Sequence, residues 1–127
     1  MIYVQNKCPR VQKVVLRGAW GRVIAQGSIN PGQWWNHYMD ANNCHSCNIG
    51  TNTGKTLLAE WSHKGNEIWW NLSTDAGYQY PPMRFYATQK DSPQMYCNHR
   101  YCRHGHPGDS HINVSGGQYN LVVQYCG

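Results

Sequence analysis

The clearest hydrophobic pattern in the chain runs from Leu57 to Met83. An apolar run there leads to a polar turn at Lys64–Gly65–Asn66 and returns as a second apolar run at Glu67–Leu72. Two β-type runs joined by a short glycine-containing turn predict a β-hairpin. This hairpin should supply much of a hydrophobic core, because it holds three of the six tryptophans, Trp61, Trp69 and Trp70.

Glu60 and the Trp69–Trp70 pair are the positions of this hairpin that bear on function. Consecutive strand residues point to opposite faces, so one of the two tryptophans should enter the core and the other should be exposed. Glu60 lies between apolar neighbours, where a buried carboxylate would need a partner. It is either a strand residue that faces solvent or a residue of a functional site.

The rest of the chain also has β-type patterning, and no long segment keeps the helical period. Short apolar or alternating runs predict strands at 2–6, 11–20, 23–27, 33–39, 83–87 and 119–125. Two polar segments interrupt them. Residues 40–54 are expected to form a surface loop with one short strand near Ile49, and residues 88–111 a long cysteine- and histidine-rich loop. The pattern predicts a single all-β domain over residues 1–127.

Six cysteines in 127 residues are typical of a small secreted domain with three disulfides. The first residues resemble a strand rather than a signal peptide, so we interpret the chain as a mature form with Met1 added for expression. No apolar run is long enough to span a membrane. A cytosolic protein with reduced thiols is the alternative.

Reduced cysteines would offer zinc ligands, because Cys44, Cys47, Cys97 and Cys102 could act with His104 and His106. The unequal spacing within the two cysteine pairs disfavours this interpretation. A surface metal site built from His104, His106 and His111 is a further alternative. We predict no metal and no cofactor, and we expect the histidines to lie in a solvated, pH-sensitive loop.

The formal charge of +5 and the pI of about 9.0 come from scattered basic residues rather than from a continuous stripe. Nucleic acid is therefore not an expected partner. Such a charge favours loose attraction to anionic polysaccharides or membrane surfaces.

Several motifs, taken in order, resemble those of the thaumatin-like proteins, and the short length is similar to that of the small secreted fungal members. The resemblance covers residues 1–86 and 119–127. The motifs that carry it are Asn6-x-Cys8, Pro31-Gly32-x-Trp34, Leu58-Ala59-Glu60-Trp61, Asn71-Leu72-Ser73 with Gly77-Tyr78 and Pro82-Met83, and a terminal Val122-Val123-x-Tyr125-Cys126.

The resemblance implies a flattened, disulfide-linked antiparallel β-sandwich in which the first cysteine bonds the last, Cys8 to Cys126. The positions of both cysteines at the ends of terminal strands agree with this pairing. For the other four, Cys44–Cys47 and Cys97–Cys102 are the simplest pairs, and cross-pairs between the two segments are the alternative.

Larger members of the family carry an acidic cleft that is linked to β-1,3-glucan binding and weak hydrolysis, and Glu60 matches its glutamate. The next acidic position is Asn71 here, and a further one falls on Ala76, with Asp75 one residue early. Glycoside hydrolysis needs two carboxyl groups flanking the bond, so these departures favour binding over catalysis. Asn71 also begins an N-glycosylation sequon, as does Asn113, and a glycan on Asn71 would block the cleft.

We therefore predict a secreted, monomeric defence, antifungal or effector-type protein that binds a β-glucan-like cell-wall polysaccharide or cell surface without catalysis. Aromatic faces suit stacking on sugar rings, and the candidate ligand-binding residues are Glu60, Asn71, Tyr78, Trp69 and Trp34. One alternative is a weak β-1,3-glucan hydrolase that uses Glu60 with Asp75 or Asp40. Another is a basic toxin or inhibitor that acts on a protein or membrane through the histidine-rich segment 97–111.

Overall fold

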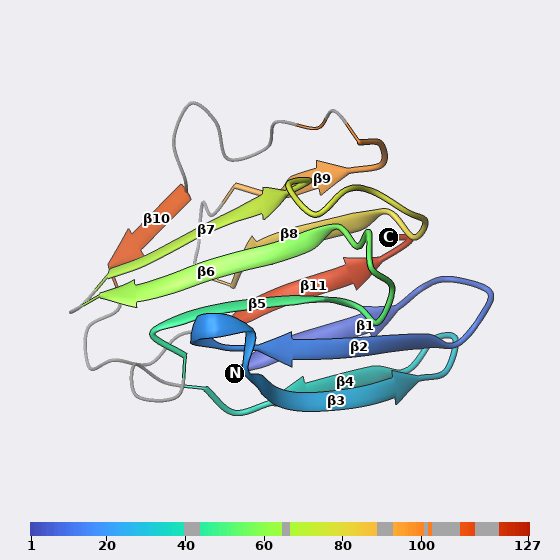
Figure 1. The fold of residues 1–127 in the computed structure, drawn as a ribbon, viewed down its shortest axis with the longest axis horizontal. Helices are drawn as coiled ribbons and strands as arrows, with labels where there is room; N and C mark the ends of the chain where they lie inside the picture. Colours follow the sequence, from blue (N-terminus) through green and yellow to red (C-terminus); the bar gives the residue numbers. More distant parts are fainter. Residues whose placement is uncertain (40–43, 65–66, 89–92, 101, 103–109, 114–119) are drawn as a thin grey trace.

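Two β-sheets lie face to face in the computed structural model of the chain (Figure 1). The structure describes residues 1–39, 44–64, 67–88, 93–100, 102, 110–113 and 120–127. In spatial order, the five-stranded sheet consists of β4 (Trp34–His37), β1 (Ile2–Asn6), β11 (Leu121–Tyr125), β8 (Met83–Ala87) and β9 (Met95–Cys97). The six-stranded sheet consists of β10 (Ser110–Asn113), β7 (Glu67–Ser73), β6 (Leu58–Lys64), β5 (Ser46–Thr51), β2 (Gln12–Arg17) and β3 (Val23–Ile29). The predicted all-β, disulfide-linked sandwich is confirmed.

The core lies between the two sheets and follows from the alternation of side chains along the strands. In β1 and β8 every second residue is buried and the residues between them are partly exposed. Trp70, Tyr125 and Phe85 are the largest fully buried side chains. Trp61 of the six-stranded sheet packs against Phe85 of the five-stranded sheet, with ring centroids 6.1 Å apart. Aromatic contacts of this kind stabilise the sandwich beyond the burial of apolar area alone.

The predicted hairpin is present as β6 and β7, and its register fixes which side chains share a face. Trp61 pairs with Trp70, and both point into the core. Trp69 points to the outer face and is 37% exposed, whereas Trp70 is fully buried. The expectation that the two neighbouring tryptophans separate between core and surface is confirmed. Residues 65–66 of the predicted turn lie outside the described part of the chain.

The predictions for the two polar segments are wrong in part. The short strand expected near Ile49 is present, but it is longer than a loop segment would hold: Ser46–Thr51 form β5, an inner strand of the six-stranded sheet between β2 and β6. In β5, Cys47 and Ile49 are buried while Ser46 and Asn48 face outward, so a strand alternation is present in a polar composition. Segment 88–111 contains β9 and the start of β10, which lie at the ends of the two sheets.

The two ends of the chain meet in the five-stranded sheet. β1 pairs with β11 in parallel, the one departure from the expected antiparallel pairing among the described strands. The Cys8–Cys126 disulfide lies just beyond this pair and closes a loop of 118 residues. On the loop-entropy model such a closure destabilises the unfolded chain by roughly 4–5 kcal/mol.

The other disulfides are local, and the six cysteines are all paired. The structure has Cys44–Cys47 and Cys97–Cys102 rather than cross-pairs between the two segments. No cysteine is left as a free thiol. Among the described residues, no helix has the length and apolar character needed to cross a bilayer.

Candidate functional site

A row of polar side chains crosses the outer face of the six-stranded sheet. By strand register, Arg17 of β2 lies opposite Asn48 of β5, Asn48 lies opposite Glu60 of β6, and Glu60 lies opposite Asn71 of β7. Directly opposed residues of neighbouring strands have side chains about 5 Å apart and interact on one face. The row therefore presents a guanidinium, two amides and a carboxylate within four adjacent strands.

Glu60 lies in a depression of about 240 Å³ on this face. The Asn71 side-chain amide donates a hydrogen bond to Glu60 Oε1 at 3.3 Å. Both side chains are partly buried, which limits competition from water. The lining residues are Ser46, Cys47, Asn48, Glu60, Trp61, Ser62, Trp69 and Asn71. The depression thus combines one carboxylate, two amides and two hydroxyls with the exposed part of the Trp69 ring, a set that suits hydrogen bonding to a polyol and stacking against it.

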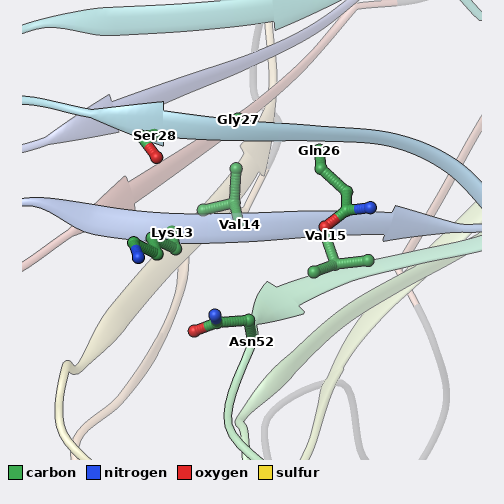
Figure 2. A pocket seen from close by; sticks show the side chains of 7 residues that line it. All are labelled: Lys13, Val14, Val15, Gln26, Gly27, Ser28 and Asn52. Carbon is green, nitrogen blue, oxygen red and sulfur yellow. The ribbon is translucent and has the colours of Figure 1, made fainter.

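A second depression of about 350 Å³ lies on the same sheet over β2 and β3. Figure 2 shows the side chains that line it, with Gln26 next to Val15 and with Lys13 and Ser28 on the other side of Val14. The Asn52 backbone N–H donates to the Lys13 carbonyl at 3.0 Å, which ties the end of β5 to β2. The charged group of this second depression is the Lys13 ammonium, whereas that of the first is the Glu60 carboxylate.

Charged residues of both signs lie along the six-stranded sheet. Lys13 and Arg17 are exposed on β2, Glu60 lies on β6, and Glu67 of β7 is opposite Lys64 of β6 by register. A ligand over β2 would therefore meet cationic donors, whereas a ligand over the first depression would meet the Glu60 carboxylate.

The structure brings together three of the five predicted ligand-binding residues, namely Glu60, Asn71 and Trp69. Trp34 does not join them, because it belongs to β4 of the other sheet. Tyr78 does not line the depression either; it follows β7 and packs against the core. Burial, and then the nearby Tyr96 and Tyr80, raise the pKa of Tyr78. The alternation of residues along a strand predicts which face of a sheet a side chain lies on, but not which of the two sheets contains it. It therefore could not show that Trp34 and Tyr78 lie away from Glu60.

The predicted hydrolytic pair of Glu60 and Asp75 is not assembled in this depression. Asp75 is exposed beyond the end of β7, where its backbone N–H donates to Ser73 Oγ at 3.2 Å. Of the described residues, Glu60 is the one carboxylate that lines the depression. Asp40, His104 and His106 lie outside the described residues. The described residues of the depression thus supply amide and hydroxyl groups and the Glu60 carboxylate, but no second carboxyl group.

Asn48, Ser46 and Ser62 are site residues that the sequence reasoning missed. Ser62 lies opposite Ser46 on one side and Trp69 on the other. These three residues form a second row across the outer face, next to the row that contains Glu60. The signal for Asn48 and Ser46 was their alternation with Cys47 and Ile49, which was obscured by the polar composition of the segment.

Solved structures with the same architecture exist, although no protein-family model and no curated protein sequence matches the chain. The thaumatin-like xylanase inhibitor TLXI superposes with a TM-score of 0.78 at 15% identity, over 99% of both chains. The protein elicitor MoHrip2 from Magnaporthe oryzae superposes with a TM-score of 0.74 at 14% identity, over 99% of this chain and 98% of that one. The protein is therefore a small member of the thaumatin-like fold.

Proposed function

We propose that the protein is an extracellular, non-catalytic binding protein of the defence or effector type, which holds a neutral β-glucan-like polysaccharide over the Glu60 depression. The observation that carries this proposal is the grouping of Glu60, Asn71 and Trp69 on one open sheet face. Sugar hydroxyls can donate to the carboxylate and exchange hydrogen bonds with the amide, while the indole covers the apolar face of a sugar ring. Three disulfides suit an oxidising, extracellular compartment.

The test is a binding isotherm on insoluble β-1,3-glucan, with chitin as a second polymer. Hydrogen bonds to a charged group contribute about 1.5–3 kcal/mol, so Glu60→Gln should weaken binding roughly 10-fold or more. Trp69→Ala should weaken binding as well. Glu67→Gln is the matched control, because Glu67 lies on the same face but does not line the depression. Equal binding by wild type and Glu60→Gln would place the polysaccharide elsewhere.

The same preparations distinguish binding from hydrolysis. We expect no release of reducing sugar from laminarin, since the depression holds a single carboxylate among the described residues. Release that disappears in Glu60→Gln would establish the hydrolase alternative instead.

A second candidate function is binding to an enzyme that degrades polysaccharide. It is supported by the full-length structural match to a protein named as a xylanase inhibitor, and by the basic side chains gathered at β2. Glycoside hydrolases carry two carboxyl groups in their active-site clefts, to which a basic surface is complementary. Residual xylanase activity measured against increasing protein concentration tests this function separately from glucan binding.

A further inference from the structure

The turn between β2 and β3 displays a tryptophan that the rest of the fold does not cover. Trp20 lies in a short 3-10 segment, η1 (Ala19–Gly21), at one end of the sandwich (Figure 1). Its relative exposure is 102%, so no other described residue covers the ring. The other exposed tryptophans, Trp34 at 51% and Trp69 at 37%, keep about half or more of their surface covered.

Trp20 also has an unusual backbone conformation, with φ of 61° and ψ of 22°. This left-handed region favours glycine, and a bulky residue there is strained. The sequence has glycines on either side, at Gly18 and Gly21, and still has tryptophan at the strained position. The Trp20 side chain does not contribute to the core, so its strained and exposed position suits contact with a partner molecule.

The Trp20 turn, which we define as residues 17–22, is held by its own hydrogen bonds. Gly18 N–H donates to the Arg22 carbonyl at 2.8 Å, and Gly21 N–H donates to the Gly18 carbonyl at 3.2 Å. The Arg17 guanidinium donates to the Gly21 carbonyl at 3.1 Å. The ring is therefore presented on a braced turn, and ordering the turn on binding costs little.

The exposure of both ring faces distinguishes the classes of partner. A sugar ring stacks on one face of an aromatic side chain and leaves the other face to be covered by the protein that carries it. With both faces bare, Trp20 would be only half covered by a polysaccharide, whereas a concave pocket in another protein would enclose the ring. A pocket of this kind, lined by aromatic and apolar groups, is the usual environment of tryptophan at the centre of protein interfaces.

The positive charge of the Trp20 turn indicates the chemistry of the partner protein. Arg17 and Arg22 bracket the turn, both are exposed, and residues 17–22 contain no acidic side chain. We propose that the Trp20 turn inserts into the carboxylate-bearing active-site cleft of a polysaccharide-degrading enzyme, with Trp20 enclosed by the cleft walls and the two arginines facing its carboxylates. This inference rests on the second candidate function above, and it names the surface that performs it.

Calorimetric titration and inhibition kinetics test the proposal, with a purified endo-xylanase and a purified endo-β-1,3-glucanase as probes. We expect inhibition of at least one enzyme that is competitive with its polysaccharide. Trp20→Gly should weaken that binding about 30-fold or more, as expected for loss of a buried interface tryptophan. Arg22→Gln should lessen the salt dependence of the association rate. Trp20→Gly removes the ring but adopts positive φ without strain, so its thermal melting midpoint should not fall below that of wild type.

Trp34→Ala is the matched control, because it removes an exposed tryptophan from the other sheet and should leave enzyme binding unchanged. Binding that persists in Trp20→Gly would overturn the assignment of the turn while leaving the enzyme-binding function in place. No binding of either enzyme by wild type would overturn both. Loss of β-1,3-glucan binding, or of binding to phosphatidylserine vesicles, in Trp20→Gly with enzyme binding intact would assign the turn to sugar or membrane and overturn the proposal.

Discussion

Asn71 donates its side-chain amide to Glu60 across the β6–β7 ladder, at 3.3 Å and in direct register. The amide thereby occupies one lone pair of the Glu60 carboxylate. The same position carries an aspartate in the family that the sequence resembles. A neutral partner beside Glu60 is consistent with a carboxylate that accepts hydrogen bonds and does not share a proton with a second acid.

Replacing Asn71 with aspartate should make stability depend on pH in the acid range. Two carboxylates directly opposite each other repel, and each raises the pKa of the other. A carboxyl whose pKa is raised by folding stabilises the fold below its unfolded pKa of about 4 and loses that effect as pH rises. Asn71→Asp should therefore match wild type near pH 3 and be less stable by roughly 0.5–1 kcal/mol at pH 7 in urea unfolding.

Asn36→Asp is the control for this charge effect, because Asn36 is exposed on β4 and lies opposite Tyr3 rather than a carboxylate. Its difference from wild type should not grow between pH 3 and pH 7. If Asn71→Asp behaves in the same way as this control, then Glu60 and residue 71 do not interact in solution.

Much of the fold could be predicted from alternation and turn chemistry. The β6–β7 hairpin, the first and last strands, and the separation of Trp69 from Trp70 depend on local patterns of apolar and polar residues. For β5 the sequence predicted only a short strand near Ile49, because the polar outward residues and the nearby cysteines gave the rest of the segment the composition of a loop. Its position inside the six-stranded sheet depends on pairing with β2 and β6. A local pattern of apolar and polar residues does not specify which strands pair.

The candidate site was predictable only where residues lie on the hairpin itself. Glu60 and Asn71 are paired by the hairpin register, and Trp69 is two residues from Asn71 on the same face. Asn48 and Ser46 reach the site through β5, and the short strand predicted near Ile49 did not show that they lie opposite Glu60 and Ser62 of β6. The β-type pattern puts Trp20 at the end of a strand, and its complete exposure depends on a left-handed turn conformation that apolar and polar patterning does not encode.

The two neighbouring tryptophans of β7 should respond very differently to truncation. Trp70 is fully buried, so Trp70→Ala leaves a large cavity and should lower the free energy of unfolding by about 3–5 kcal/mol. Trp69 lies on the outer face, so Trp69→Ala should change this free energy by less than about 1 kcal/mol. Urea denaturation followed by far-UV circular dichroism measures both. Similar losses from the two variants would contradict the register of β7.

Asn6 should be one of the most sensitive polar positions in the chain. It is fully buried, and its side-chain amide donates to the carbonyls of Arg10 at 2.8 Å and Ile29 at 2.7 Å. Its side-chain carbonyl accepts from Cys8 N–H at 2.8 Å. Asn6→Ala removes these partners within the core, and each buried group left unpaired costs about 1–3 kcal/mol.

We therefore expect Asn6→Ala to lower the free energy of unfolding by roughly 3 kcal/mol or more. Asn36→Ala, at an exposed position of β4, should change it by less than about 0.5 kcal/mol. Equal denaturation midpoints for these two variants would show that the Asn6 hydrogen bonds add little to stability.

Tyr125 should make the protein sensitive to alkali. Its ring is among the largest fully buried side chains, and its hydroxyl has no hydrogen-bond partner among the described residues. Burial raises the pKa of this phenol well above its ordinary value of 10.0. The folded state therefore keeps the phenol neutral at a pH where the unfolded chain ionises, and stability falls as pH rises above about 10, by up to roughly 1.4 kcal/mol per pH unit.

Tyr125→Phe removes both the ionisable group and an unpaired buried hydroxyl while keeping the ring. At pH 7 it should be as stable as wild type or more stable by about 1 kcal/mol, because burial of a hydroxyl without a partner is unfavourable. Above pH 10 its free energy of unfolding should fall less steeply than that of wild type. Urea unfolding at pH 7, 9, 10 and 11 measures both effects. Parallel pH profiles for the two proteins, or a marked loss of stability at pH 7, would show that the Tyr125 hydroxyl has a hydrogen-bond partner in solution.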